Sequence, residues 1–137
     1  MELEALQEVH SEIRALGAQI VAITPELERY AGVVHRKHNL TFDILSDPHL
    51  KTAEQFRLVH VLPEYLRELY RSFGSTLDKF NDESEYRLPM PARYIVDSSG
   101  IIRTADVNAD YTIRPEPAET VKKLAEFKQS RETGQKN

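Results

Sequence analysis

One unit occurs twice near the start of the chain: a short apolar run, then a capping residue followed by proline, then an amphipathic stretch. In the first copy, residues 18–23 are apolar and rich in branched side chains, which is typical of a strand buried on both faces. Thr24, Pro25 and Glu26 follow, and a hydroxyl, a proline and an acid in this order favour a helix start. A helix to about His38 is therefore expected.

The second copy begins with the apolar residues 42–45 and continues with Ser46, Asp47 and Pro48. The same order of cap and proline predicts a helix to about Phe56. Alternation of strands and helices favours an α/β fold with a parallel or mixed sheet over a helix bundle or a β-sandwich.

The clearest hairpin signal lies between residues 92 and 107. Residues 92–96 and 101–107 have the composition of strands, and residues 97–100, Asp-Ser-Ser-Gly, have that of a turn. Gly100 can adopt the left-handed conformation that a bulged hairpin turn requires. Three further amphipathic helices are predicted: over residues 3–16, from Pro63 to Gly74, and after Pro117.

Length and composition indicate one domain. The 137 residues with 40% hydrophobic content suffice for one core, which we place in residues 1–129, with residues 130–137 as a polar, disordered tail. A net charge of -4 argues against a nucleic-acid partner. No apolar run approaches the roughly 20 residues that span a bilayer, and no signal peptide is evident, so no membrane partner and a cytoplasmic location are expected.

The sequence contains no cysteine. This removes disulfides, thiolate nucleophiles, zinc-thiolate sites and iron–sulfur clusters together. No cofactor is expected.

Residues 88–100, Leu-Pro-Met-Pro-Ala-Arg-Tyr-Ile-Val-Asp-Ser-Ser-Gly, are followed by a second specific stretch at residues 105–117. Together they resemble the peroxiredoxin-like branch of the alkyl hydroperoxide reductase and thiol-specific antioxidant family. The resemblance extends through residues 3–16, the Thr24-Pro25-Glu26 turn, residues 45–47 and the final helix. It implies a thioredoxin-like three-layer α/β fold, with a mixed sheet, a C-terminal hairpin and a final helix.

In that family the first helix carries a redox motif, Cys-x-x-Cys or a single cysteine, at its N-terminus, directly after a central strand. Here residues 2–6 resemble the family's sequence just downstream of the cysteines, so the fold is expected to be truncated at its N-terminus. Two explanations for the missing segment remain open: the chain or gene was cut short, or the segment was lost in evolution. A thiol ionises at neutral pH when a helix N-terminus stabilises its anion, and no residue here replaces it. No catalytic residue is therefore expected.

By the same resemblance Pro91 corresponds to the cis-proline that faces the redox motif and shapes the substrate groove. The alternative is an ordinary trans proline at a strand start. Typical peroxiredoxins carry an active-site arginine where this chain has Pro91, so peroxide reduction is less assured than thiol–disulfide exchange. Arg93 is a candidate to substitute in the groove, although a partly exposed arginine in a salt bridge is the commoner case.

Three charged residues, Asp106, Asp110 and Arg114, lie around the loop after the hairpin, where they could bind an anion but more often stabilise the loop through side-chain pairs. His35 and His38 have a helical i, i+3 spacing that two metal ligands can share. No third ligand is in register, so no metal site is expected.

Loss of the central strand should leave a gap in the sheet. We expect direct closure of the sheet, strand exchange in a homodimer, or marginal stability. The leading functional hypothesis is a thiol-dependent antioxidant or oxidoreductase domain that is inactive as this chain, with a thiol reductant as partner only in a full-length form. The alternative is a non-catalytic interaction or structural module that retains the fold.

Overall fold

The computed structural model describes residues 2–61, 63–72, 87–108 and 115–135. The elements run in the order α1 (Glu2–Glu8), α2 (His10–Ala15), β1 (Val21–Thr24), α3 (Glu28–Lys37), β2 (Asp43–Ser46), a 3-10 turn η1 (Pro48–Leu50), α4 (Lys51–Gln55), β3 (Val59–Val61), α5 (Glu64–Ser72), β4 (Arg87–Pro89), β5 (Ala92–Val96), β6 (Ile102–Val107) and α7 (Pro117–Gln135). The expected α/β class is confirmed.

The strands form three separate pairs. β1 and β2 pair in parallel, whereas β3 with β4 and β5 with β6 are antiparallel. One continuous mixed sheet is therefore not formed by the strands that the structure describes.

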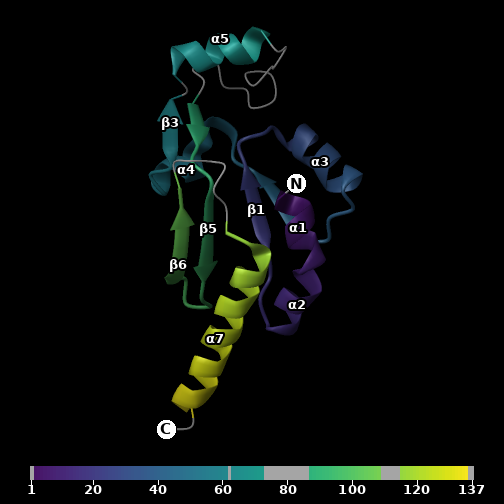
Figure 1. Cartoon of the computed structure of the whole chain (residues 1–137), viewed down its shortest axis with the longest axis vertical. Helices are drawn as coiled ribbons and strands as arrows, with labels where there is room; N and C mark the ends of the chain where they lie inside the picture. The colour runs from purple at the N-terminus through teal and green to yellow at the C-terminus, as the bar shows by residue number, and fades with distance from the viewer. Residues whose placement is uncertain (1, 62, 73–86, 109–114, 136–137) are drawn as a thin grey trace.

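β1 and β5 lie on either side of the break in the sheet. Figure 1 shows them running in opposite directions, with α7 crossing in front of the space between them. Within the described ranges neither strand has a second partner, since β1 bonds to β2 and β5 bonds to β6. The expectation that the sheet closes directly is therefore wrong for these strands.

The burial of β1 reflects this break. Val21 and Ile23 are 47% and 55% exposed, while Ala22 between them packs on the core. The sequence predicted burial on both faces. That prediction is wrong because Val21 and Ile23 face an open cleft between β1 and β5 and stay about half exposed.

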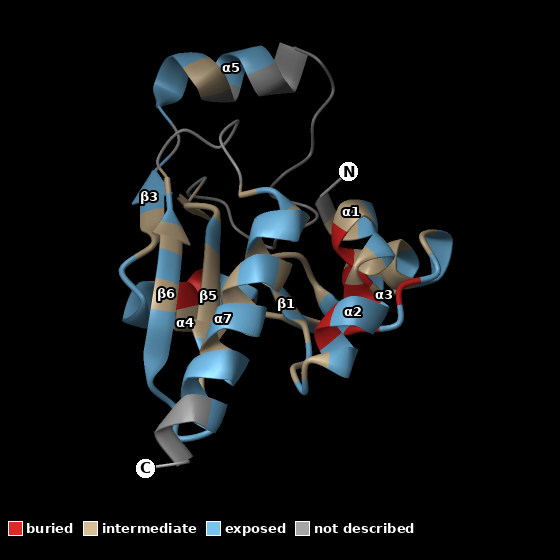
Figure 2. Ribbon diagram, turned by 60° about the horizontal axis from the view of Figure 1, so that its bottom comes forward, coloured by how far each residue is buried: buried red, intermediate tan, exposed pale blue. Residues whose placement is uncertain are grey.

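The buried side chains form two separate groups. Those that the structure describes all lie between residues 6 and 53, on α1, α2, α3, α4 and the loops beside β2. Figure 2 shows them as a red cluster along α1 and α2 and a smaller one at α4. The described residues of β5, β6 and α7 contain none, so the hairpin half is the more weakly packed.

Hydrogen bonds between α1, α2 and the loop before β2 reinforce this core. Thr41 donates its backbone N–H to Oε1 of Gln7 (2.8 Å), and Nε2 of Gln7 donates to Oγ1 of Thr41 (2.7 Å). Nδ1 of the buried His10 lies 2.6 Å from the same Oγ1, and its ring packs edge-on against Phe42. No pattern in the sequence indicated this cluster.

Several helix boundaries differ from those predicted. The predicted helix over residues 3–16 is interrupted at Val9, and α3 starts at Glu28 because the Thr24 hydroxyl accepts from the Glu26 N–H in a turn instead of capping the helix. At the other end, α7 continues to Gln135, where the sequence predicted an irregular tail from Ser130.

The hairpin has the turn that the sequence predicted. Gly100 adopts a φ of 86°, and the register shifts between Ile95 and Val96 as in a bulge. The Asp97 carboxylate accepts hydrogen bonds from the Ser99 hydroxyl, the Ile101 N–H and the Arg103 guanidinium, which hold the pKa of that carboxyl well below its usual range. Asp97 therefore fixes the turn as an anion.

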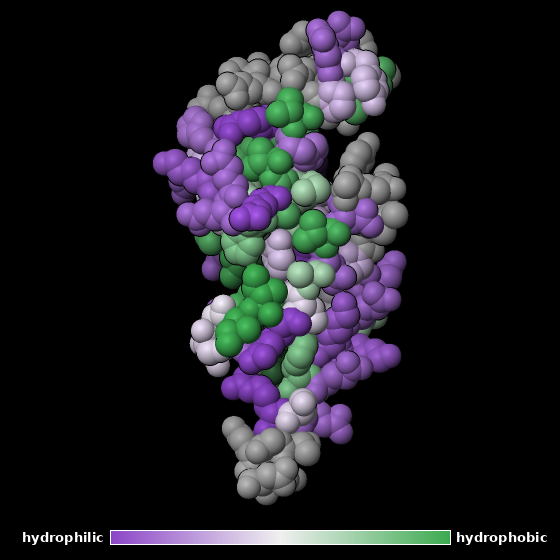
Figure 3. Space-filling view, turned by 90° about the vertical axis from the view of Figure 1, so that its left-hand side faces the viewer, coloured by the Kyte–Doolittle hydropathy of each residue, from purple (hydrophilic) through white to green (hydrophobic). Residues whose placement is uncertain are grey.

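The side of the molecule formed by β3, β6 and α4 carries apolar patches separated by charged side chains (Figure 3). The exposed apolar residues in or next to these elements include Phe56, Val61, Ile102 and Val107. Among the described helices, none is both long and apolar enough to cross a membrane.

Candidate functional site

A cleft of about 420 Å³ lies between β1 and β5. One wall comes from β1 and the turn after it, the other from β5 and the segment before it, and the floor from α4 and its flanks. The lining residues are Val21, Ile23, Thr24, Pro25, Asp47, Thr52, Ala53, Phe56, Leu58, Pro89, Met90, Pro91, Ala92 and Tyr94.

Asp47 organises the floor of the cleft. The residue is only 6% exposed, and its carboxylate accepts hydrogen bonds from the backbone N–H groups of Thr52 and Ala53, each at 2.9 Å. Its own N–H donates to the carbonyl of Thr24 at 2.7 Å, which ties the end of β1 to the start of α4. The sequence predicted a cap at residues 46–48, and Asp47 caps α4 from a position four residues before that helix begins.

The backbone around the cap is strained. His49 and Leu50 both have φ near +60°, in the left-handed region that residues other than glycine seldom occupy. Burial of Leu50, which is 2% exposed, offsets part of this cost and anchors the turn beneath the cleft.

A pair of aromatic rings lines the β5 side of the cleft. The rings of Phe56 and Tyr94 lie 5.2 Å apart between centroids and are tilted by 38°. The Met90 N–H donates to the Leu58 carbonyl at 2.7 Å, which holds the segment containing Pro91 against the end of α4. These contacts give the wall an apolar and partly rigid surface.

The two predicted groove residues lie differently. Pro91 lines the cleft, but the peptide bond before it is trans, so the cis expectation is wrong. Arg93 does not line the cleft. Its guanidinium donates to the carbonyl of Pro115 at 2.9 Å and to the Thr120 hydroxyl at 3.1 Å, and so holds β5 to α7.

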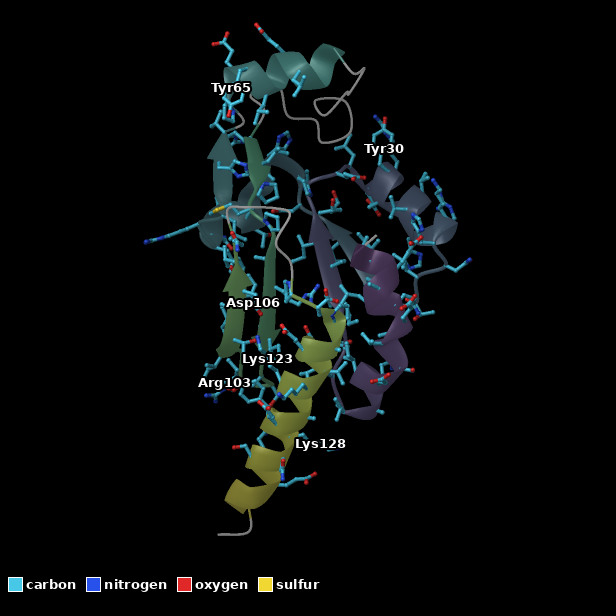
Figure 4. The ribbon with its side chains drawn as sticks, viewed as in Figure 1. Tyr30, Tyr65, Arg103, Asp106, Lys123 and Lys128 are labelled. Atoms are coloured by element: carbon cyan, nitrogen blue, oxygen red, sulfur yellow. The ribbon has the colours of Figure 1, made fainter. Side chains whose placement is uncertain are left out.

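The three loop candidates are not brought together by the described structure. Asp106 pairs with Lys123 at 3.2 Å, and Figure 4 shows the two side chains between β6 and α7. Asp110 and Arg114 lie outside the described residues.

Few of the side chains that line the cleft are chemically reactive. Asp47 is the one acidic or basic side chain among the lining residues, and both of its oxygens are engaged. No three His, Asp or Glu side chains in the described part of the chain are grouped so as to hold a metal ion, and His38 instead contacts the Glu4 carboxylate through Nδ1. The lining residues that the structure describes suit an uncharged group and offer no thiol, since the sequence has no cysteine.

Comparison with known proteins supports the resemblance read from the sequence. The profile of the AhpC/TSA family matches residues 1–105, which include the first helix, both strand–cap–helix units and most of the hairpin. No match was found among the curated proteins. The match covers well over half of the chain, and the α/β elements agree with a thioredoxin-like fold, so the chain belongs to the AhpC/TSA family.

Proposed function

We propose that this chain is the scaffold of a thiol-dependent antioxidant or oxidoreductase domain and that the chain itself is catalytically inactive. The observation that carries the proposal is the absence of cysteine from all 137 residues of a chain whose family match spans residues 1–105. We infer the class of reaction from the family to which the chain belongs. We expect the chain to be inactive because it has no thiol.

The inactivity follows from what reduction of a peroxide or disulfide requires. A thiolate must attack one oxygen of the O–O bond, or one sulfur of the S–S bond, and release the other as the leaving group. Thr24 and Thr52 line the cleft, but a hydroxyl needs an adjacent base to become a nucleophile. Thr24 is already an acceptor for the Glu26 N–H, and the cleft lining offers no base beyond the engaged Asp47.

A peroxide-consumption assay tests this proposal. The purified chain is mixed with hydrogen peroxide and dithiothreitol, with a peroxiredoxin that retains its peroxidatic cysteine assayed in parallel as the active control. The expected rate equals that of the blank without protein. Turnover that scales with the concentration of the chain overturns the proposal.

A second candidate is a non-catalytic interaction module, and the open cleft between β1 and β5 favours it. The nucleotide sequence upstream of the Met1 codon separates the two candidates. An in-frame strand followed by a cysteine motif supports the redox domain, whereas an in-frame stop codon supports the interaction module. A cytoplasmic location and a homodimer remain predictions under either candidate.

A further inference from the structure

The outer face of α3 combines positive charge with an exposed apolar side chain. Val33 is 51% exposed. Exposed cations lie four residues before it and three and four residues after it, at Arg29, Arg36 and Lys37. This spacing places the four residues on one side of the helix, and they form the α3 face. Ala31 is buried on the other side, where α3 packs on β2.

The cations of the α3 face have no acidic partner within the described residues. The ion pairs between described residues involve other side chains. Arg29 stacks on the ring of Tyr30, 4.9 Å from its centroid, which leaves the edge of the guanidinium available to a carboxylate. A side chain at Gly32 would press on the guanidinium of Arg36, so the glycine leaves room for this cation on the helix surface. The α3 face is thus a compact positive surface on a chain whose net charge is -4.

α5 has the complementary combination of carboxylates and exposed apolar side chains. Tyr65 and Leu69 are 72% and 47% exposed, and their i, i+4 spacing places them in one stripe along the helix. Glu64 and Glu68 are exposed as well and form a second stripe beside the first, and these four residues form the α5 face. Positions 67 and 71, which are arginine in the sequence, lie beyond the carboxylates and away from the apolar stripe. Figures 1 and 4 show α5 at one end of the molecule, with Tyr65 in its first turn.

The two faces complement each other in charge and in apolar character. Contact between them buries Val33 against the two apolar side chains of α5 and places the two carboxylates among the cations. The α3 face has arginines on one side of Val33 and Lys37 on the other. The carboxylates therefore meet a cation whichever way the two helices run.

Contact between the two faces needs two chains, because α3 and α5 of one chain lie apart (Figures 1 and 2). In a two-fold arrangement the α3 face of each copy meets the α5 face of the other, so the contact is made twice. Each contact is small, and the association is therefore weak and reversible. A polyanion would cover the cations but leave Tyr65 and Leu69 exposed, and the net charge of -4 would repel it.

We propose that the chain associates with a second copy of itself through contact between the α3 face of one copy and the α5 face of the other. The inference depends neither on the cleft nor on thiol chemistry. A failed peroxide assay and a failed association experiment are therefore distinguishable.

Sedimentation equilibrium of the purified chain measures the association. We expect a reversible dimer at protein concentrations of about 0.1–1 mM, the range of weak complexes. Raising the ionic strength from about 0.05 M to about 0.5 M should weaken the dimer by at least about threefold, since salt screens exposed charges. A chain that stays monomeric up to about 1 mM, or a dimer whose Kd does not depend on salt, overturns the proposal.

A charge exchange between the two faces tests which surfaces meet. An acidic variant carries Arg36→Glu and Lys37→Glu, and a basic variant carries Glu64→Lys and Glu68→Lys, so that within each variant the two faces have charge of the same sign. Each variant alone should associate at least about tenfold more weakly than the unaltered chain. An equimolar mixture should associate within about threefold of the unaltered chain, because each α3 face then meets an α5 face of opposite charge. A mixture that associates as weakly as the separate variants overturns the proposal.

Two controls carry the same changes in net charge at exposed positions outside both faces. Lys122→Glu with Lys128→Glu on α7 matches the acidic variant, and Glu8→Lys with Glu12→Lys on α1 and α2 matches the basic variant. Each control should change the Kd less than about twofold, as surface substitutions usually do. A control that weakens association as much as its matched variant assigns the effect to net charge and overturns the proposal.

An uncharged substitution tests the apolar part of the contact. Tyr65→Ala removes the most exposed apolar side chain of the α5 face and should weaken association by at least about fivefold, as loss of an aromatic anchor does. The control Ile101→Ala, at a side chain that is 51% exposed in the hairpin turn, should change it less than about twofold. Unchanged association in Tyr65→Ala overturns the proposal, and this pair decides the matter if a charge variant does not fold by circular dichroism.

Discussion

Substitution of Asp47 tests how the floor of the cleft is held together. Asp47→Ala leaves two backbone N–H groups without their acceptor. The Ala53 N–H is buried and costs about 1–3 kcal/mol when unsatisfied, whereas the Thr52 N–H is partly accessible and loses about 1 kcal/mol, as a helix cap does. The expected loss in the free energy of unfolding is about 3 kcal/mol, or about 12 °C in Tm for a chain of this size.

Asp47→Asn should cost about half as much, because its one amide oxygen can accept from only one of the two N–H groups. Thermal and urea unfolding followed by circular dichroism measures both variants. The control is Asp43→Ala, at an exposed position of β2, which should stay within about 0.5 kcal/mol of the unaltered chain. An alanine variant as stable as the unaltered chain, or an asparagine variant as unstable as the alanine variant, refutes this reasoning.

Three further outcomes follow from the packing and the ion pairs. Ile13→Ala, at a side chain that is 2% exposed, should cost about 2–5 kcal/mol in chemical denaturation, and a smaller loss contradicts its place in the core. The lowered pKa of Asp97 stabilises the fold above the ordinary carboxyl pKa of 3.8, and this contribution is lost as the pH falls through the lower value of the folded state. The difference in denaturation midpoint between the unaltered chain and Asp97→Asn should therefore be largest at about pH 7 and shrink below 3.8, and a constant difference contradicts it. Lys123→Ala should cost less than about 1 kcal/mol, because its pair with Asp106 is partly exposed, and a larger loss in urea unfolding contradicts that interpretation.

Features with a local chemical cause were predictable from the sequence. Gly100 takes its left-handed conformation because the turn after β5 needs it, and Asp47 caps α4 because a carboxylate near a helix start finds free N–H groups. The α/β class followed from the same local signals. Pro91 borders the cleft because the segment before β5, which a local run of prolines marks in the sequence, forms one of its walls.

Features with a long-range cause were not predictable in the same way. The exposure of Val21 and Ile23 depends on what lies beyond β1, and their apolar composition alone indicated burial. β3 and β4 have three residues each and pair across a long separation in the sequence, so neither shows a usable periodicity. The engagement of Arg93 with α7 likewise depends on tertiary placement that no local pattern encodes.

We expect the break between β1 and β5 to divide the molecule into two units that unfold separately. The β1–β2 pair with α1, α2 and α3 contains most of the buried side chains, whereas the β5–β6 hairpin is joined to it through helices and not through a backbone ladder between described strands. The hairpin unit should therefore open at a lower free energy than the N-terminal unit, as a separate step before global unfolding.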